Sequence, residues 1–246
     1  MFPLLQFGRY ALPLPGIILL ASLWVGLTLA EKEAKRQHQS PEPIYGLVMF
    51  ALIGGILGAR LGYVIRYLDI YLADPLSIVS LDTNTVDMMA GLVIGGLAAV
   101  AYGYRKHLPL RSTLDILTPG FAFLAVGLGL AHLASGNAFG RPTTMPWAIY
   151  LWDASRHPTQ IYETVLAAIL FLAIWFGRKA NPFAGFLFLS WVGLTAVSRL
   201  FLEAFRGDSI LVAGDIRQAQ LAALVILLLT LWLMRLWLPP QQNTPQ

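Results

Sequence analysis

Seven long apolar stretches, separated by short polar segments, dominate the hydrophobicity pattern of this chain. Each is close to the ~20 residues that a helix needs to cross the hydrocarbon core of a bilayer. Proline and glycine clusters lie in the breaks between them, as in "SPEP" at 40–43 and "GRP" at 140–142. The pattern predicts seven transmembrane helices, over residues 11–30, 44–66, 86–104, 114–136, 158–177, 183–204 and 216–238.

The composition supports this prediction and excludes several classes of function. Of the 246 residues, 57% are hydrophobic and 12% are charged, whereas a soluble domain carries roughly twice that share of charge. The chain has no cysteine, which excludes disulfides and a cysteine nucleophile. Its basic residues lie in short loops rather than in one patch, so we expect no nucleic-acid partner. We predict an all-α integral membrane protein with one polytopic domain over residues 1–246.

The loop charges predict the orientation of this domain. An excess of lysine and arginine marks cytoplasmic loops, and here it follows the first, third and fifth spans. These residues are Lys32, Lys35, Arg36, Arg105, Lys106, Arg111, Arg178 and Lys179. The N-terminus is therefore expected outside and the C-terminus in the cytoplasm. The longer connections, residues 67–85, 138–157 and 205–215, would then lie on the outer face.

Several ionisable side chains fall inside or beside the predicted spans, where an unpaired charge is costly. Arg199 and Glu203 are four residues apart and Arg206 follows one turn later, so the three share one helix face. Together with Arg60 and Arg141, these arginines suggest a bound phosphate, because the guanidinium fork matches phosphate oxygens. The alternative is a buried ion-pair network that only fixes helix packing.

The fifth span begins with an unusually polar segment, "RHPTQIYE" at 156–163. His157, Gln160 and Glu163 recur at intervals of three and so lie on nearly one face. We expect this segment mainly to support the site, with His157 and Gln160 holding the outer loop. His132, inside the fourth span, either accepts a proton or is a neutral histidine hydrogen-bonded to a carbonyl.

Other polar and small residues have structural interpretations. Asp87 is expected to cap the third span, and Asp115 to offset the dipole in the first turn of the fourth. The four histidines show no metal-ligand spacing, so we predict no metal site. Glycines at intervals of four, which favour close packing of helices, are Gly54, Gly58 and Gly62 in the second span and Gly91 and Gly95 in the third.

Two motifs in this order, "GRPTTMPWA" at 140–148 and "RHPTQIYE" at 156–163, resemble the prolipoprotein diacylglyceryl transferases, integral membrane enzymes of bacteria. Further stretches agree in order and spacing: "GARLGY" at 58–63, "YLADPL" at 71–76 and "SRLFLEAFR" at 198–206. The resemblance implies a multi-pass protein of the bacterial cytoplasmic membrane. It also implies transfer of diacylglyceryl from phosphatidylglycerol to the cysteine thiol of a lipoprotein precursor, with glycerol phosphate leaving and no cofactor.

The resemblance also implies site residues. Arg199 and Glu203 match the arginine–glutamate pair of the family's sixth span, and Gly140 matches the glycine that closes its long signature. Arg60 and the segment 156–163 match the family's usual residues. We assign Arg60, Gly140, Arg141, Arg199 and Arg206 to phospholipid binding. Glu203 would orient Arg199, and His132 would accept the thiol proton.

This chain departs from the family pattern at several positions. Gly129 stands where the family has an arginine, His132 and Ser135 where it has asparagines, and Asn137 where it has a glutamate. Met89 stands where the family has a histidine, and methionine cannot accept a proton. Two interpretations follow: a transferase with a rebuilt site, or an impaired or repurposed relative that binds phospholipid or serves as a subunit of a membrane complex.

Overall fold

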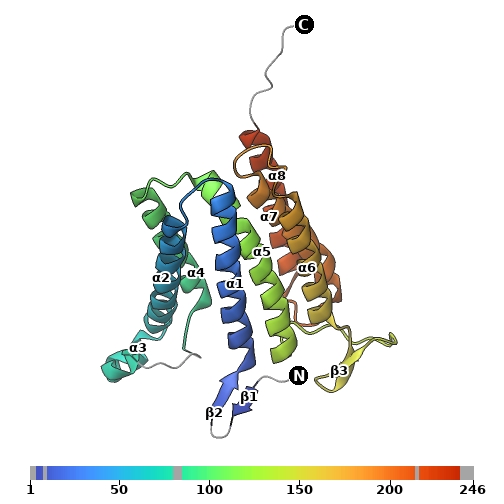
Figure 1. Cartoon of the computed structure of the whole chain (residues 1–246). Helices are drawn as coiled ribbons and strands as arrows, with labels where there is room; N and C mark the ends of the chain where they lie inside the picture. Colours follow the sequence, from blue (N-terminus) through green and yellow to red (C-terminus); the bar gives the residue numbers. More distant parts are fainter. Residues whose placement is uncertain (1–3, 8–9, 80–84, 214–215, 239–246) are drawn as a thin grey trace. The chain divides into compact units, whose positions relative to one another are not determined.

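The computed structural model describes residues 4–7, 10–79, 85–213 and 216–238 (Figure 1). Within these ranges it contains seven helices that are long and apolar enough to cross a membrane. The predicted all-α architecture with seven membrane-spanning helices is therefore confirmed. The chain divides into two compact units, one formed by Met1–Glu33 with Leu114–Gln246 and the other by Ala34–Thr113.

Two long helices form the body of the unit Ala34–Thr113: α2 (Glu42–Arg66) and α4 (Met88–Arg105). Between them lie α3 (Leu68–Ala73) and the 3-10 helix η1 (Pro75–Val79), in the predicted connection 67–85, of which residues 80–84 lie outside the described part.

Glycines let α2 and α4 approach closely, as predicted. A Cβ atom added to Gly95 would lie 2.7 Å from the carbonyl oxygen of Ala51, and one added to Gly91 would lie 2.9 Å from the Cβ of Ala59. Side chains at these positions would therefore force the two backbones apart.

Asp87 begins α4 as the predicted N-cap. Its Oδ1 accepts a hydrogen bond from the backbone N–H of Ala90 at 3.0 Å. Its Oδ2 lies 2.6 Å from Nη2 of Arg66 at the end of α2. The same carboxylate thus caps one helix and pairs with a cation of the other.

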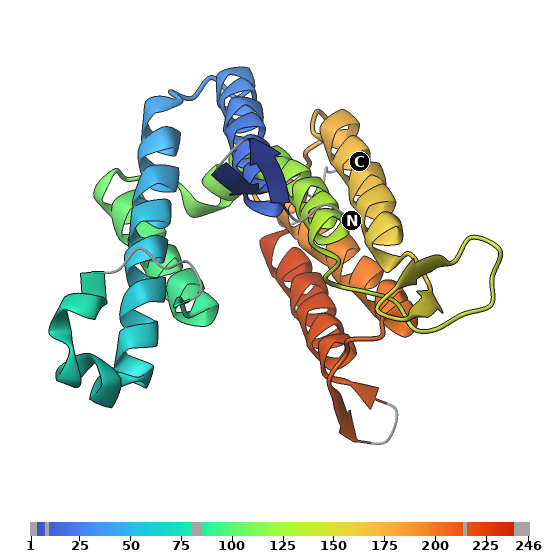
Figure 2. The ribbon, with the colours of Figure 1, turned by 90° about the horizontal axis from the view of Figure 1, so that it is seen from below.

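The larger unit is a bundle of helices with short hairpins at their ends (Figure 2). Its helices are α1 (Leu14–Arg36, to Glu33 in this unit), α5 (Leu110–Ser135, from Leu114), α6 (Thr159–Gly177), α7 (Phe186–Leu202) with the 3-10 turn η2 (Glu203–Phe205), and α8 (Gln218–Trp237). The antiparallel hairpins are β1 (Leu4–Phe7) with β2 (Tyr10–Pro13), β3 (Ile149–Leu151) with β4 (Ala154–Arg156), and β5 (Leu211–Ala213) with β6 (Ile216–Arg217). Residues 214–215 of the predicted outer connection 205–215 lie outside the described part.

The first membrane helix begins later than predicted, at Leu14 rather than residue 11. Pro13 explains the difference, because a residue that precedes proline favours an extended backbone, whereas Pro15 lies in the first turn of the helix, where proline is tolerated. Residues 10–13 instead pair with residues 4–7 as a hairpin.

Asp115 does not offset the dipole of its own helix, and that expectation was wrong. Because α5 already begins at Leu110, Asp115 lies beyond its first turn. Its buried carboxylate instead caps α7. Oδ2 accepts from Nδ2 of Asn181 at 2.8 Å and from the N–H of Gly185 at 2.7 Å, and Oδ1 accepts from the N–H of Phe188 at 2.9 Å.

We predict that Asp115→Ala lowers the stability of the purified protein by about 3 kcal/mol, because buried donors at the start of α7 lose a charged acceptor. Asp115→Asn keeps one acceptor oxygen and should cost less. Thermal unfolding in detergent micelles measures both variants. Equal stability of Asp115→Ala and the wild type would contradict this role.

Candidate active site

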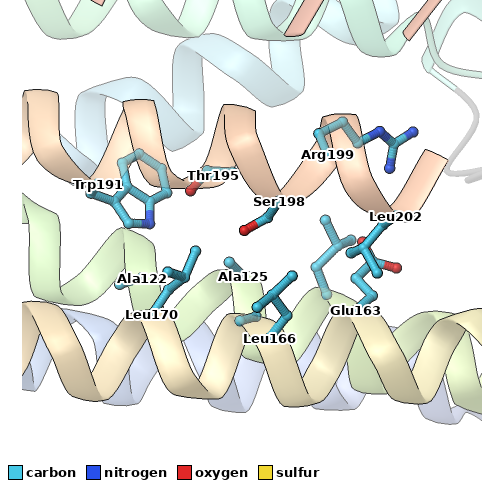
Figure 3. A pocket seen from close by; sticks show the side chains of 12 residues that line it. Ala122, Ala125, Glu163, Leu166, Leu170, Trp191, Thr195, Ser198, Arg199 and Leu202 are labelled. Carbon is cyan, nitrogen blue, oxygen red and sulfur yellow. The ribbon is translucent and has the colours of Figure 1, made fainter. Parts of the chain in front are cut away.

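An apolar groove runs between α5, α6 and α7 in the larger unit (Figure 3). Its volume is about 220 Å³, and alanine, leucine and tryptophan side chains form most of its wall. Trp191 and Ala122 lie at one end, while Glu163 and Arg199 lie at the other (Figure 3). We call the Glu163–Arg199 end the charged end. The groove is thus amphiphilic along its length.

Glu203 organises the polar residues beside this charged end. Its carboxylate is buried, with 1% of the side chain exposed, and Oε2 lies 3.1 Å from Nε of Arg199. Nε of Arg206 is 3.9 Å from the same oxygen. Oε1 accepts a hydrogen bond from the hydroxyl of Ser209 at 2.5 Å. Arg199 itself is 37% exposed, so Glu203 can orient it while its guanidinium still reaches a ligand.

The guanidinium of Arg206 is already engaged by a carboxylate. Its Nε and Nη2 donate to the two oxygens of Asp208 at 2.9 and 2.7 Å. Burial lowers the pKa of Arg206, but the hydrogen bonds that it donates to Asp208 and the charges of Asp208, Glu203 and Glu163 raise this pKa above its ordinary value. Arg206 therefore stays a cation, and a phosphate would have to compete with Asp208 for its fork.

Arg217, at the end of β6, is a central member of this cluster that the sequence analysis missed. Its guanidinium is nearly fully buried and donates through Nη1 to the carbonyls of Glu203 and Arg206, the latter at 2.9 Å, and to the hydroxyl of Ser209 at 3.0 Å. Arg217 lies within the predicted span 216–238. Arg199 was identified because it is an ionisable residue inside a predicted span. The same criterion applied to Arg217 would have identified it too.

The loop after α5 meets the loop after α7 through backbone hydrogen bonds around Gly140. The N–H of Arg141 donates to the carbonyl of Phe205 at 2.8 Å, and the N–H of Gly207 donates to that of Phe139 at 2.9 Å. A Cβ on Gly140 would overlap the carbonyl of His157 and lie 2.7 Å from its Cβ. Gly140 therefore allows this crossing. The side chain of Arg141 is exposed and has no ion pair among the described residues.

The polar start of α6 anchors the loop after α5. Gln160 is fully buried, and its Nε2 donates to the carbonyl of Asn137 at 3.0 Å. The hydroxyl of Thr159 donates to the carbonyl of Ala138 at 2.6 Å. The ring of His157 packs edge-on against Phe205 at 5.3 Å. Thr159 and Gln160 thus bind the backbone of the loop after α5, and His157 packs against the residue that ends η2. The supporting role of His157 and Gln160 stays a prediction.

His132 and Glu163 contact each other across α5 and α6. Nδ1 of His132 lies 2.9 Å from Oε2 of Glu163, and both side chains are partly buried. Both residues were candidates from the sequence, but their spacing of 31 residues did not predict that they form a pair. A histidine in contact with a carboxylate has a defined orientation, which a catalytic base requires.

Arg60 belongs to the other unit, where it anchors the connection after α2. Its guanidinium donates to the carbonyls of Ser77 at 2.6 Å, Ile78 at 3.0 Å and Thr85 at 2.9 Å. The ring of Tyr71 lies 5.4 Å from its Cζ. A role of Arg60 in phospholipid binding stays a prediction.

The sequence model of the prolipoprotein diacylglyceryl transferases matches residues 3–236. The chain belongs to this family. Among its relatives, the phosphatidylglycerol–prolipoprotein diacylglyceryl transferase of Thermus thermophilus is 28% identical, over 94% of this chain and 96% of the relative. The enzymes of that name from Trichormus variabilis and Finegoldia magna are 26% and 29% identical, over 90% and 87% of this chain and 84% and 86% of the relatives. The chain is a multi-pass membrane protein of this family.

Two of the positions at which this chain departs from the family's sequence motifs are Met89 and Gly129. The structure shows what surrounds each of them. Met89, where the resemblance implies a histidine, is 73% exposed. Gly129, at the position of the arginine, faces the backbone of α6: a Cβ there would lie 2.9 Å from Cα of Thr164. An arginine at 129 would require the two helices to separate.

We predict that Arg217→Lys loosens the loop after α7. The shorter and more flexible lysine side chain would not hold its ammonium at the position of Nη1, which contacts two carbonyls and a hydroxyl. Losing a charged hydrogen bond costs roughly 1.5–3 kcal/mol. Amide hydrogen exchange at residues 203–213 should become at least about tenfold faster, whereas exchange in α5 and α6 should be unchanged. A uniform change over all helices would contradict a local role.

Proposed function

We propose that this chain is a phosphatidylglycerol–prolipoprotein diacylglyceryl transferase of the bacterial cytoplasmic membrane. It would move diacylglyceryl from the phospholipid to the cysteine thiol of a lipoprotein precursor. The observation that carries this proposal is the groove of α5, α6 and α7, which is apolar along its length and charged at one end. A phospholipid has the same distribution of polarity, and the named relatives carry this activity in their names.

In this proposal the groove holds part of one of the two acyl chains of the donor lipid among its apolar side chains, with the phosphate at the charged end. Arg199 is the primary phosphate ligand, because it lines the groove, is partly exposed and is held by Glu203. Arg141, which follows Gly140 in the loop after α5, is a second cation. Arg206 is a third, and its Nε lies 3.9 Å from the Glu203 carboxylate. These guanidinium groups neutralise the charge that develops on the departing phosphate.

The transfer needs a base, a nucleophile and a stabilised leaving group. The chain has no cysteine, so the nucleophile is the thiol of the precursor. His132 accepts the thiol proton, and the thiolate forms a sulfur–carbon bond with the glyceryl carbon that carries the phosphate ester. The carbon–oxygen bond of that ester breaks, its electron pair stays on the phosphate oxygen, and glycerol phosphate leaves.

The second candidate function is phospholipid binding without transfer, in a repurposed relative or a subunit of a membrane complex. The observations that favour it are the exposed Met89 and the close packing at Gly129, which remove two of the family's polar groups. In this case the groove and Arg199 would still bind lipid, but no thioether would form.

We expect Arg199→Ala and His132→Ala to lower turnover about 10²-fold or more, because each removes a group that acts in the transition state. The assay follows glycerol phosphate release from phosphatidylglycerol vesicles with a lipobox peptide. Arg235→Ala, which removes an exposed arginine near the end of α8, is the matched control and should keep full activity. Full activity of His132→Ala would show that another group accepts the proton.

Filling the groove should impair the use of lipid. Ala125→Phe places a ring in the groove wall, and we expect it to raise KM for phosphatidylglycerol about tenfold. Ala222→Phe makes the same change at an exposed position of α8 and should leave KM unchanged. An unaltered KM in a folded Ala125→Phe protein would mean that the acyl chain lies elsewhere.

A further inference from the structure

We propose that Glu163 is the positioning residue of His132, so that the two side chains act as one proton-accepting pair. The inference deepens the proposed function and rests on it. The sequence alone placed Glu163 among the residues that support the site. The structure instead places its carboxylate against the imidazole, 2.9 Å from Nδ1.

This contact selects one tautomer of the imidazole. An ionised carboxylate only accepts hydrogen bonds, so the proton of a neutral His132 lies on Nδ1 and points at Glu163. The lone pair is then on Nε2, the nitrogen that can accept a proton from a thiol. Once Nε2 is protonated, the same carboxylate stabilises the imidazolium.

The close approach of α5 and α6 makes the pair possible. Gly129 lies one helical turn before His132, and Thr164 directly follows Glu163. A Cβ on Gly129 would lie 2.9 Å from Cα and 3.0 Å from the backbone nitrogen of Thr164. Glycine at 129 therefore lets the helices meet at this level. The position where the family has an arginine is thus the position that brings the new pair together.

Glu163 of this pair lies at the charged end of the groove, and His132 contacts it from α5. Glu163 lines that end together with Arg199, and its charge also acts on Arg206. The other charged groups at or beside this end are Arg199 on α7, and Glu203 and Arg206 directly after α7.

The first test measures the tautomer of His132 directly. Nitrogen NMR of the full-length protein, with labelled histidine, gives the resonances of His132 after subtraction of the spectrum of His132→Asn. We expect the Nδ1–H form of the neutral ring in the wild type and a mixture of tautomers in Glu163→Ala. Asp153→Asn removes an exposed carboxylate in the turn between β3 and β4, and should leave the tautomer unchanged. A wild-type ring protonated on Nε2 would overturn the proposal.

The second test is a mutant cycle in the glycerol phosphate release assay. Glu163→Ala should lower kcat about 10²-fold with KM for the lipid within about threefold of wild type, and Glu163→Asp should restore part of the loss. Because Glu163 acts through His132, the double variant His132→Ala with Glu163→Ala should be no slower than His132→Ala alone.

The remaining outcomes separate the two proposals. An active wild type with an equally active Glu163→Ala would overturn the positioning role and leave the transferase function intact. Loss of activity in Glu163→Ala but not in His132→Ala would also overturn it, because the carboxylate would then act on the substrate directly. A wild type that never releases glycerol phosphate would overturn the proposed function, and the catalytic role of the pair with it.

Discussion

The buried carboxylate of Glu203 is the group on which the charged end of the site depends. An ionised group that is almost fully buried must be paired, because the cost of removing it from water is large. Here Arg199 and Arg206 supply the cations and Ser209 donates a hydrogen bond, while Arg217 binds the backbone carbonyl of the same residue. The buried charge thus fixes the end of α7 and the following loop and leaves Arg199 facing the groove, while Arg217 ties the same residue's backbone to the start of α8.

Close helix contacts provide the other half of the site. The missing side chain of Gly129 allows α6 to approach α5, and Gly140 allows the loop after α5 to cross the loop after α7. Both contacts bring polar groups together in a bundle that is otherwise apolar. The contact at Gly129 lies one helical turn from His132, so it is also what allows the His132–Glu163 pair to form.

Local patterns in the sequence predicted much of the fold and some of the site. Hydropathy predicted the seven spans, a single polar residue before a span predicted the Asp87 cap, and a four-residue interval predicted the Arg199–Glu203 pair. Each of these depends on residues close in sequence. Asp115 caps a helix 70 residues away and His132 meets a partner 31 residues away. No spacing rule predicts such contacts, because helix packing decides them. Orientation in the membrane stays a prediction from loop charges.

The most direct test of the central claim is the coupling between product and leaving group in the wild-type protein. Purified protein in phosphatidylglycerol vesicles would be incubated with a lipobox peptide, and both thioether-linked diacylglyceryl peptide and free glycerol phosphate would be quantified by mass spectrometry. The account predicts that the two products appear together in equal amounts and that a peptide with serine in place of the cysteine yields neither. Bound phosphatidylglycerol without either product would contradict it.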